Sequence, residues 1–245
     1  MVKRERLDKL LVERGLAATR AEARRRILAG EVLLEEKPAS KAGSLIDPTA
    51  PIRLTRARVY LSRGGDKLEK ALADFALDVA GRVVLDVGAS TGGFTDCLLM
   101  AGARLVYAVD VGHDQIATAL RADVRVVVFE KTDIRHLNAD RLTEQPELAV
   151  VDASFISLRL ILPAVRDLLV PGGAIVALIK PQFEVGKEKI GKGVVRRAEE
   201  HERVIDEIKA AAVADGLEPL GLTESPLLGA KGNKEFFIHL RKVDR

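Results

Sequence analysis

Hydrophobic and polar residues follow one another in runs whose length and spacing distinguish helices from strands. Short apolar runs rich in β-branched residues predict buried strands, and apolar residues three or four apart predict amphipathic helices. Between residues 82 and 180 the two kinds of segment alternate. Strands are predicted at 82–88, 105–111, 124–130, 147–154 and 172–180. This alternation is typical of a doubly wound parallel sheet with helices on both faces, so the fold class expected is α/β.

The pattern changes on either side of this alternating region. Before it, "LSRGGDKLEKALADFAL" predicts a helix near Asp66, with Gly64 and Gly65 as a flexible entry. After it, "EEHERVIDEIKAAAVADG" predicts an amphipathic helix. The last segments, "SPLLG" and "EFFIHLRKV", predict a closing pair of strands at an antiparallel edge of the sheet.

The first 60 residues have an organisation of their own. Two helices are predicted in "RLDKLLVERG" and "ATRAEARRRILAG", where Gly15 and Gly30 would end them. "EVLLEEKPAS" then predicts a strand and a turn around Pro38. We therefore expect a small α+β domain over residues 1–58, a linker over 59–64 and a second domain over 65–245.

Charge is distributed unevenly between these two parts. Residues 1–60 carry 14 Lys and Arg against 8 Asp and Glu, whereas residues 61–245 carry 25 against 28. An arginine-rich helix can pair with the phosphates of a nucleic acid, although solvated basic helix faces are also common. Cys97 is the only cysteine of the sequence, and no apolar run approaches the ~20 residues of a membrane span. We expect a cytoplasmic protein.

The stretch "LDVGASTGGFTDCLL" predicts a strand, a glycine-rich turn and a helix. A phosphate-binding loop would need a lysine where Phe94 stands, and a dinucleotide fingerprint would need a glycine where Ser90 stands. Asp86 would also repel an anion. A carboxylate in that position suits a ligand that carries an ammonium group, such as the methionine end of S-adenosylmethionine, and this interpretation fits best.

Four charged residues stand where predicted strands end: Asp86, Asp110, Asp152 and Lys180. Ligands of parallel sheets bind outside the carboxyl ends of the strands, so these residues predict one site. Asp110 is in the usual position for a carboxylate that binds ribose hydroxyls. Asp133, just past the third strand, either accepts a hydrogen bond from an adenine amino group or caps a turn.

A second group of residues has the chemistry for acting on a hydroxyl. Lys180 follows an apolar strand, and together with Asp152 from the adjoining strand it could contact a substrate hydroxyl. Lys67 lies in the helix before the sheet, and Glu235 begins the last strand. Sequence spacing permits these four side chains to meet but does not require it.

The N-terminal segments "RLDKLLVERG" and "ATRAEARRRILAGEV", with the short hairpin that follows, resemble the S-four-type RNA-binding domain. The resemblance covers roughly residues 3–55. It implies that the second helix and the hairpin hold structured RNA, without identifying which RNA. The candidate RNA-binding residues are Arg6, Arg20, Arg24, Arg25 and Lys41.

Nearly the whole chain resembles the hemolysin A (TlyA) family of ribosomal RNA 2′-O-methyltransferases, whose catalytic domain is FtsJ-like. The motifs that carry the resemblance are "SRGGDKLEKAL", "LDVGASTGGFTDCLL", "AVDVG", "VDASFISL", "LIKPQFEVG" and "NKEFF". It implies a Rossmann-like S-adenosylmethionine-dependent methyltransferase sheet, a cytidine ribose of 16S or 23S ribosomal RNA as substrate, and a catalytic set of Lys67, Asp152, Lys180 and Glu235. The candidate cofactor-binding residues are Asp86, Gly88, Ser90, Thr91, Gly92, Gly93, Asp110 and Asp133.

The chemistry asked of such a site is modest. A methyl sulfonium is intrinsically reactive, so catalysis consists mostly of alignment and of help with the departing proton. Because lysine is ordinarily protonated at neutral pH, the sequence leaves open whether Lys180 removes that proton or only positions the hydroxyl. Two other functions also stay open: RNA and cofactor binding without turnover, and the membrane damage that the name hemolysin suggests. The histidines lack metal-ligand spacing, so no metal is expected.

Overall fold

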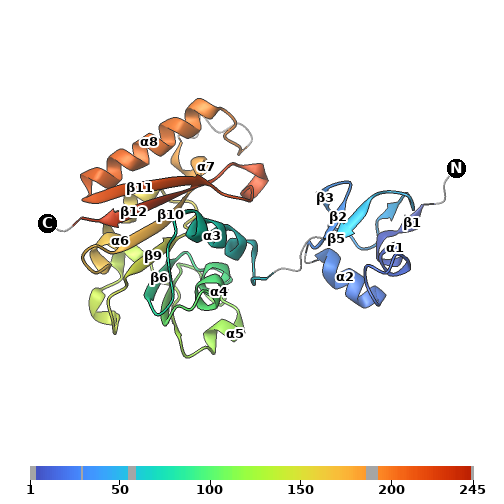
Figure 1. Ribbon diagram of the computed structural model, residues 1–245, viewed down its shortest axis with the longest axis horizontal. Coiled ribbons are helices and arrows are strands. Elements are labelled where there is room, and N and C mark those ends of the chain that lie inside the picture. Colours follow the sequence, from blue (N-terminus) through green and yellow to red (C-terminus); the bar gives the residue numbers. More distant parts are fainter. Residues whose placement is uncertain (1–3, 29, 55–58, 186–192, 244–245) are drawn as a thin grey trace. The chain divides into compact units, whose positions relative to one another are not determined.

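The structure, a computed structural model, describes residues 4–28, 30–54, 59–185 and 193–243 (Figure 1). This part of the chain divides after Val59 into a small N-terminal unit and a large C-terminal unit. The boundary predicted at residue 58 lies outside the described residues, and the limits of the domains and the linker remain a prediction.

The small unit combines two helices with short strands. Its elements are β1 (Glu5–Arg6), α1 (Leu7–Glu13), α2 (Arg20–Leu28), β2 (Val32–Leu34), β3 (Lys37–Pro38), β4 (Leu45–Ile46) and β5 (Ile52–Leu54). β2 pairs antiparallel with β3 and β5, and β1 pairs antiparallel with β4. Leu7, Leu10 and Leu11 of α1 pack with Ile27 of α2 in a core of their own. A shared apolar core explains why these short elements are stable together.

One turn of the small unit differs from its prediction. The chain reverses at Glu35 and Glu36, which have positive φ angles of 49° and 62°, and not around Pro38. Pro38 instead pairs with Leu33 as part of β3. β3 is an edge strand, where a residue without a backbone N–H is tolerated.

A seven-stranded sheet forms the large unit, in the order β11-β12-β10-β9-β6-β7-β8. Its strands are β6 (Val83–Val87), β7 (Leu105–Val109), β8 (Val126–Phe129), β9 (Leu148–Val151), β10 (Ala174–Ile179), β11 (Leu217–Glu224) and β12 (Phe236–Lys242). The pairs from β8 to β10 are parallel, and β12 runs antiparallel to both of its neighbours. The predicted α/β sheet with an antiparallel edge is therefore confirmed.

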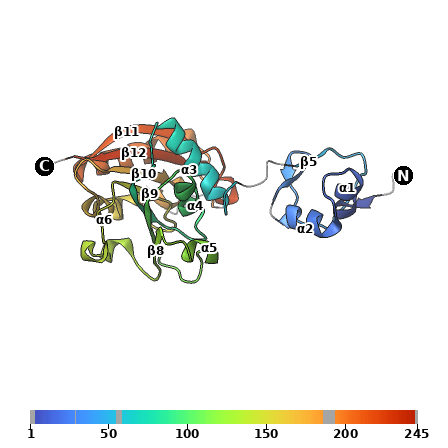
Figure 2. The same cartoon turned by 60° about the horizontal axis from the view of Figure 1, so that its bottom comes forward.

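Helices cover both faces of this sheet (Figures 1 and 2). The helices are α3 (Arg63–Asp74), α4 (Gly93–Met100), α5 (Thr118–Arg121), α6 (Leu162–Leu168), α7 (Pro181–Glu184) and α8 (Ala198–Ala214); short 3-10 turns lie at Ile134–His136, Ala139–Arg141, Leu158–Leu160 and Ala230–Gly232. Alternate residues of each strand face opposite sides, so Leu85 of β6 joins α6 and α8 in one apolar cluster and Val84 joins α3 and α4 in the other. The loops at the strand ends are thereby held by two separate cores.

Two predicted boundaries in the large unit are wrong. Helix α3 begins at Arg63 with Ser62 as its N-cap, so Gly64 and Gly65 are helical and not a flexible entry. A Cβ at Gly65 would lie 2.3 Å from the ring of Tyr60, so glycine is used here for close packing. The first strand of the closing pair is β11 and not "SPLLG". Its sequence does not have the pattern of a strand because it contains Pro219. The proline is tolerated because β11 is an edge strand whose register is irregular after Pro219.

No described helix is long and apolar enough to cross a membrane.

Candidate active site

A cavity of about 450 Å³ lies at the carboxyl ends of β6, β7 and β9. From β6 the chain moves outward to β7 and β8 on one side, and it then returns to place β9 on the other side. This reversal is the topological switch point at which α/β sheets bind ligands. The cavity is lined by residues from the segments that follow β6, β7, β8 and β9, among them Gly88, Ser90, Asp110, Asp133 and Asp152.

The turn after β6 shapes one wall of the cavity. Gly88 has a φ of 85°, and a Cβ there would lie 2.7 Å from the carbonyl oxygen of Asp152. Ser90 has a positive φ of 48°, and its backbone N–H donates to Asp110 Oδ2 at 2.8 Å. The N–H of Gly112 donates to the other oxygen of Asp110 at 2.7 Å. The Asp110 carboxylate thus ties two loops together at the cavity and keeps a fixed orientation.

Asp86 lies fully buried at the end of β6 and is not among the residues that line the cavity. Its Oδ2 accepts a hydrogen bond from Thr95 Oγ1 at 2.6 Å, whereas its Oδ1 has no hydrogen-bond partner among the described residues. Burial raises the pKa of this carboxyl to about 7. A buried oxygen without a donor is the kind of group that an ammonium ligand would satisfy.

Four other cofactor candidates have structural partners. A Cβ at Gly92 would lie 2.1 Å from Leu120, and one at Gly93 would lie 1.9 Å from Ser62 Oγ, so both glycines permit close packing behind the cavity. Thr91 accepts the backbone N–H of Ala117 through its carbonyl oxygen. Asp133 lines the cavity, but it also caps a 3-10 turn and pairs with Arg135 at 2.5 Å. Contact of these four residues with a cofactor remains a prediction.

Two ion pairs hold the four residues implied as catalytic. Lys180 Nζ lies 2.6 Å from Asp152 Oδ1, and Lys67 Nζ lies 2.6 Å from Glu235 Oε2. Both lysines and Glu235 are largely buried, and Asp152 faces the cavity. Lys67 comes from α3, Asp152 and Lys180 follow neighbouring parallel strands, and Glu235 precedes β12. The fold therefore brings segments that are 168 residues apart into one cluster of charges.

The two pairs also act on each other. Burial raises the pKa of Asp152, while the charges of Lys180 and Lys67 lower it. Besides the Asp152 carboxylate, Lys180 Nζ contacts two further acceptors, Ser154 Oγ at 2.9 Å and the carbonyl oxygen of Asp152 at 3.4 Å. These two acceptors engage two of the three N–H donors of an ammonium group, and the contact with Asp152 Oδ1 is an ion pair without hydrogen-bond geometry. These contacts hold the Lys180 side chain beside the cavity-lining residues Asp152 and Ser154.

Two family models match the sequence of this chain. Residues 60–242 match the model described as FtsJ-like methyltransferase, and residues 5–52 match the S4 domain. The chain belongs to the FtsJ-like methyltransferases. It also carries an S4 domain at its N-terminus, so both predicted resemblances are confirmed.

Named relatives agree with this assignment. The chain is 43% identical to the 16S/23S rRNA (cytidine-2′-O)-methyltransferase TlyA of Mycobacterium tuberculosis, with 100% of this chain and 93% of the relative covered. It is 38% identical to hemolysin A of Brachyspira hyodysenteriae, with 96% and 98% covered. A solved structure named "Putative hemolysin from Streptococcus thermophilus" has a TM-score of 0.78 and 46% identity, and covers 100% of this chain and 90% of that one.

Several residues of this FtsJ-like site were missed by sequence reasoning. Gln182 Nε2 donates to Glu235 Oε1 at 3.2 Å, and a Cβ at Gly229 would lie 1.8 Å from that same oxygen. Gln182 and Gly229 therefore set the position of Glu235. The glutamine stands two residues after Lys180 in "LIKPQFE", so its place next to the lysine was the available signal.

Phe155 is a further residue of the motif "VDASFISL" to which the sequence alone assigned no role. Its side chain is 89% exposed, it lines the cavity, and its φ is +65°. Its ring centroid lies 4.9 Å from that of Phe183. A large apolar side chain held outward in a conformation that costs free energy offers a stacking surface beside the cavity. An aromatic residue between the polar residues of "DASFIS" was the signal.

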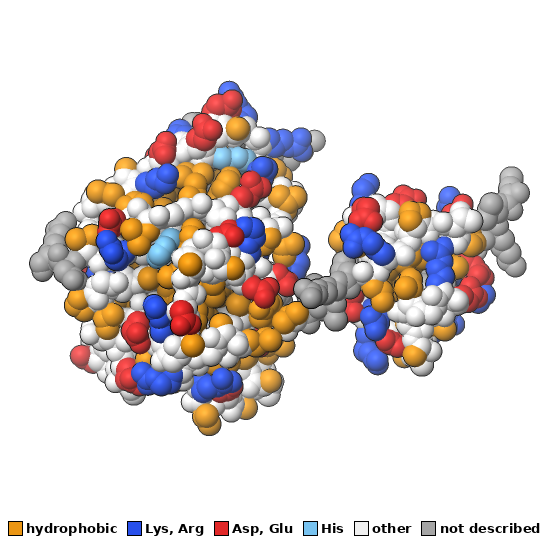
Figure 3. Space-filling model, in the orientation of Figure 1, with side chains coloured by type: hydrophobic (Ala, Val, Ile, Leu, Met, Phe, Trp, Pro, Cys, Tyr) orange, Lys and Arg blue, Asp and Glu red, His pale blue; other side chains and the backbone are white. Residues whose placement is uncertain are grey.

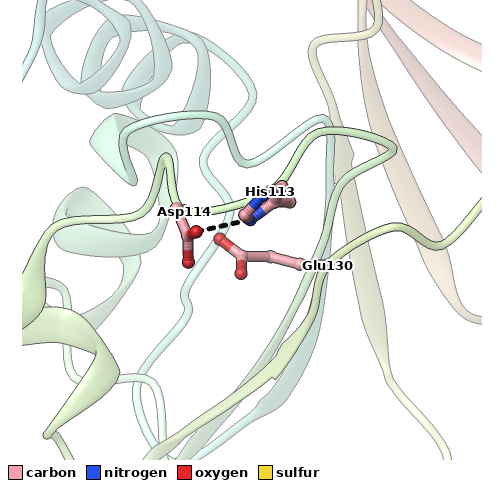
Figure 4. Close-up of side chains that lie close together, drawn as sticks. All are labelled: His113, Asp114 and Glu130. Carbon is pink, nitrogen blue, oxygen red and sulfur yellow. Dashed lines mark ion pairs between the residues drawn. The ribbon is translucent and has the colours of Figure 1, made fainter.

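His113, Asp114 and Glu130 come together near the start of α5, with one ligand-type atom of each within 4.8 Å of the others (Figure 4). His113 Nδ1 lies 2.6 Å from Asp114 Oδ2. Glu130 is already engaged, because it accepts hydrogen bonds from Arg121 at 2.7 Å and from the N–H of Gln115. We assign no metal to this exposed cluster, and the expectation of a metal-free protein remains a prediction.

The RNA-binding candidates lie on the small unit, where basic side chains are interspersed with acidic ones (Figure 3). Arg6 follows Glu5 in β1, Arg20, Arg24 and Arg25 belong to α2, and Lys41 precedes the turn before β4. All five residues are exposed. The structure therefore leaves each of them accessible to a polyanion, while their contact with RNA remains a prediction.

Proposed function

We propose that this protein transfers the methyl group of S-adenosylmethionine to the 2′-oxygen of a cytidine ribose in 16S or 23S ribosomal RNA. The observation that carries the proposal is the position of Asp152. Its side chain lines the cavity at the switch point and also pairs with Lys180 of the charged cluster. The proposed cofactor site and the proposed reaction site therefore adjoin at one residue.

Residues that line the cavity, together with the fully buried Asp86 at the end of β6, fit the cofactor. Asp110 offers a fixed carboxylate to the ribose hydroxyls, and the unpartnered Oδ1 of Asp86 fits the ammonium of the methionine end. The cavity volume lies in the range of ordinary small-molecule sites. When bound, S-adenosylmethionine supplies an electrophilic methyl group.

The charged cluster then has a defined task. The new bond joins the ribose 2′-oxygen to the methyl carbon, the carbon–sulfur bond breaks, and the hydroxyl proton must leave. A protonated Lys180 donates to the 2′-oxygen and fixes one lone pair toward the methyl carbon; the Asp152 carboxylate, which lines the cavity, is the nearest base for the proton. Lys67 and Glu235 neutralise each other beside this pair and keep its electrostatic field constant.

The exposed ring of Phe155 supports a nucleoside as the acceptor. Aromatic side chains beside such a site stack on bases, and RNA bases are recognised mainly when they are unpaired. The S4 domain and the relative that is named for cytidine-2′-O-methylation support ribosomal RNA as the source of that nucleoside. We also propose a cytoplasmic location, where ribosomes are found.

The decisive experiment supplies S-adenosylmethionine labelled in its methyl group to the protein with purified 30S or 50S subunits. Label on a ribose 2′-oxygen, absent with a Lys180→Ala variant that still binds the cofactor, is the expected result. Label on a base would overturn the proposed reaction. Cofactor and RNA binding without any label would favour a binding-only protein, and leakage from liposomes at equal protein concentration would favour a membrane-active one.

A further inference from the structure

One carboxylate in the small unit is surrounded by arginines. Asp8, in the first turn of α1, is 0% exposed, yet its oxygens accept hydrogen bonds from three guanidinium groups. Arg6 donates through Nε and Nη2, both at 3.0 Å. Arg20 Nη2 lies 3.0 Å from Asp8 Oδ2, and Arg24 Nε lies 3.3 Å from the same atom. The three arginines thus converge on one buried point.

A single partner would suffice to neutralise this carboxylate. The hydrogen bonds from Arg6, together with those from Arg20 and Arg24, outweigh burial and hold the pKa of Asp8 well below its usual range. Two positive charges remain in excess. The three arginine side chains are 43%, 51% and 55% exposed, so their remaining N–H groups face solvent. Asp8 therefore anchors each guanidinium by one edge and leaves the other edge available.

The turn that follows Lys41 belongs to the same cluster. The backbone N–H of Asp8 donates to the carbonyl oxygen of Ala42 at 3.0 Å. The guanidinium of Arg6 lies against Gly43, where a Cβ would be 3.2 Å from Nη1. Asp8 thus links β1, α1, α2 and this turn through its side chain and its backbone. Arg25, by contrast, points about 100° away from Arg24 around α2.

We propose that Asp8 is the positioning residue of the RNA-binding surface, which holds Arg6, Arg20 and Arg24 as a preformed site for the phosphates of folded RNA. The inference rests on the proposed ribosomal RNA substrate. Free arginines lose much side-chain entropy when they bind, and arginines that are already held lose less. Three cations fixed at one point match phosphates that RNA folding brings close together, rather than the spaced phosphates of a flexible single strand.

Asp8→Asn tests the proposal because charge and position predict opposite outcomes. Asparagine removes a negative charge, so electrostatic attraction alone predicts tighter binding of RNA. Loss of the carboxylate that holds the three arginines in position predicts weaker binding of RNA. We expect the KM for the methylated ribosomal subunit to rise about tenfold, while kcat at saturating subunit and the Kd for S-adenosylmethionine stay within about twofold of wild type.

Glu13→Gln is the matched control. Glu13 lies on the same α1 helix and pairs with the exposed Lys9, so its substitution changes the charge equally without touching Asp8. We expect it to leave KM unchanged or slightly lower. Circular dichroism and thermal unfolding of the full chain report whether the variants are folded. A folded Asp8→Asn protein that binds subunits as well as Glu13→Gln overturns the inference and leaves the proposed function intact.

A second variant decides the matter if Asp8→Asn unfolds the small unit. Arg20→Lys with Arg24→Lys keeps both positive charges next to Asp8 but removes the planar donor forks. We expect KM to rise about fivefold, and an unchanged KM would overturn the inference. A folded wild-type protein that neither binds nor methylates 30S or 50S subunits would instead overturn the proposed function, and this inference with it.

Discussion

The two units of this protein both contain buried carboxylates beside basic side chains, and they balance charge in opposite ways. In the small unit one carboxylate, Asp8, meets three half-exposed guanidinium groups, which leaves an excess of positive charge at the surface. In the large unit two carboxylates meet two ammonium groups, and all four side chains are largely removed from solvent. An excess of positive charge suits the binding of a polyanion, whereas a cluster of balanced charges suits a reaction in which one proton moves.

The two clusters also differ in the cost of a substitution that removes one charged partner. A half-exposed arginine that loses its partner is solvated by water, so the cost is small. A buried lysine or glutamate that loses its partner keeps an uncompensated charge in a medium of low dielectric constant, and that cost is large. Substitutions in the large unit are therefore expected to have larger effects than those in the small unit, in the order that follows.

Lys180→Ala should have the largest effect on turnover. It removes the ammonium group that pairs with Asp152 and donates to Ser154, and we expect kcat to fall about 10³-fold with the cofactor Kd nearly unchanged. Single-turnover methyl transfer at saturating cofactor measures this loss. Lys209→Ala on α8 is the control and should keep wild-type turnover. A Lys180→Ala enzyme within about tenfold of wild type would contradict its assigned role.

Glu235→Gln should have the largest effect on stability. It leaves Lys67 buried without a counter-charge, and we expect a loss of about 3 kcal/mol in the free energy of unfolding. Urea titration of the full chain measures it. Glu144→Gln, which breaks the exposed pair with Arg104, should leave stability almost unchanged. Equal losses from the two variants would remove the distinction between buried and exposed pairs.

Cofactor affinity should depend on pH through Asp86. Because burial raises its pKa to about 7, this carboxyl gains a proton as the pH falls below 7 and then no longer attracts an ammonium group. Titration calorimetry should show affinity for S-adenosylmethionine falling close to tenfold from pH 7.5 to pH 6. Asp86→Asn should bind weakly at both pH values. A wild-type affinity that is constant over this range would exclude the ammonium contact.

The same raised pKa makes a prediction about stability. The folded state holds the Asp86 proton more tightly than the unfolded state, so this group makes the free energy of unfolding decrease as the pH rises from about 4 to 7. The difference between wild type and Asp86→Asn, measured by urea titration without cofactor at pH 5 and pH 7, isolates this contribution. A difference of the opposite sign would show that the carboxyl is stabilised in its ionised form.

The smallest effect is expected for single arginines of α2. Arg24→Ala should weaken binding of the subunit about fivefold, and Arg25→Ala less, because Arg24 is held by Asp8 and Arg25 lies on a different side of α2. Filter binding at two salt concentrations measures both variants. If Arg25→Ala has the larger effect, the RNA contacts lie on a different face of α2 from the cluster around Asp8.

Much of this organisation was available from the sequence, because it depends on local pattern. Valine- and leucine-rich runs identify strands of the sheet, and the glycines after them mark the turns that line the cavity. Asp86, Asp110, Asp152 and Lys180 were recognisable since a residue that ends a parallel strand must lie at the ligand-binding edge. The strand around Pro219 was not recognisable, because a proline in an edge strand has the same local pattern as a turn.

Tertiary structure decided the rest, because it concerns which distant side chains meet. Nothing in local spacing requires Lys67 to pair with Glu235, or Gly229 to leave room for that carboxylate. The packing of α3 against the sheet and the place of β12 within the sheet decide both. Likewise the sequence shows arginines at 6, 20 and 24, but only the fold shows that they converge on Asp8. The local pattern of the sequence determines which helices and strands form and which residues lie at the ligand-binding edge of the sheet, whereas the pairing of buried charges depends on long-range packing.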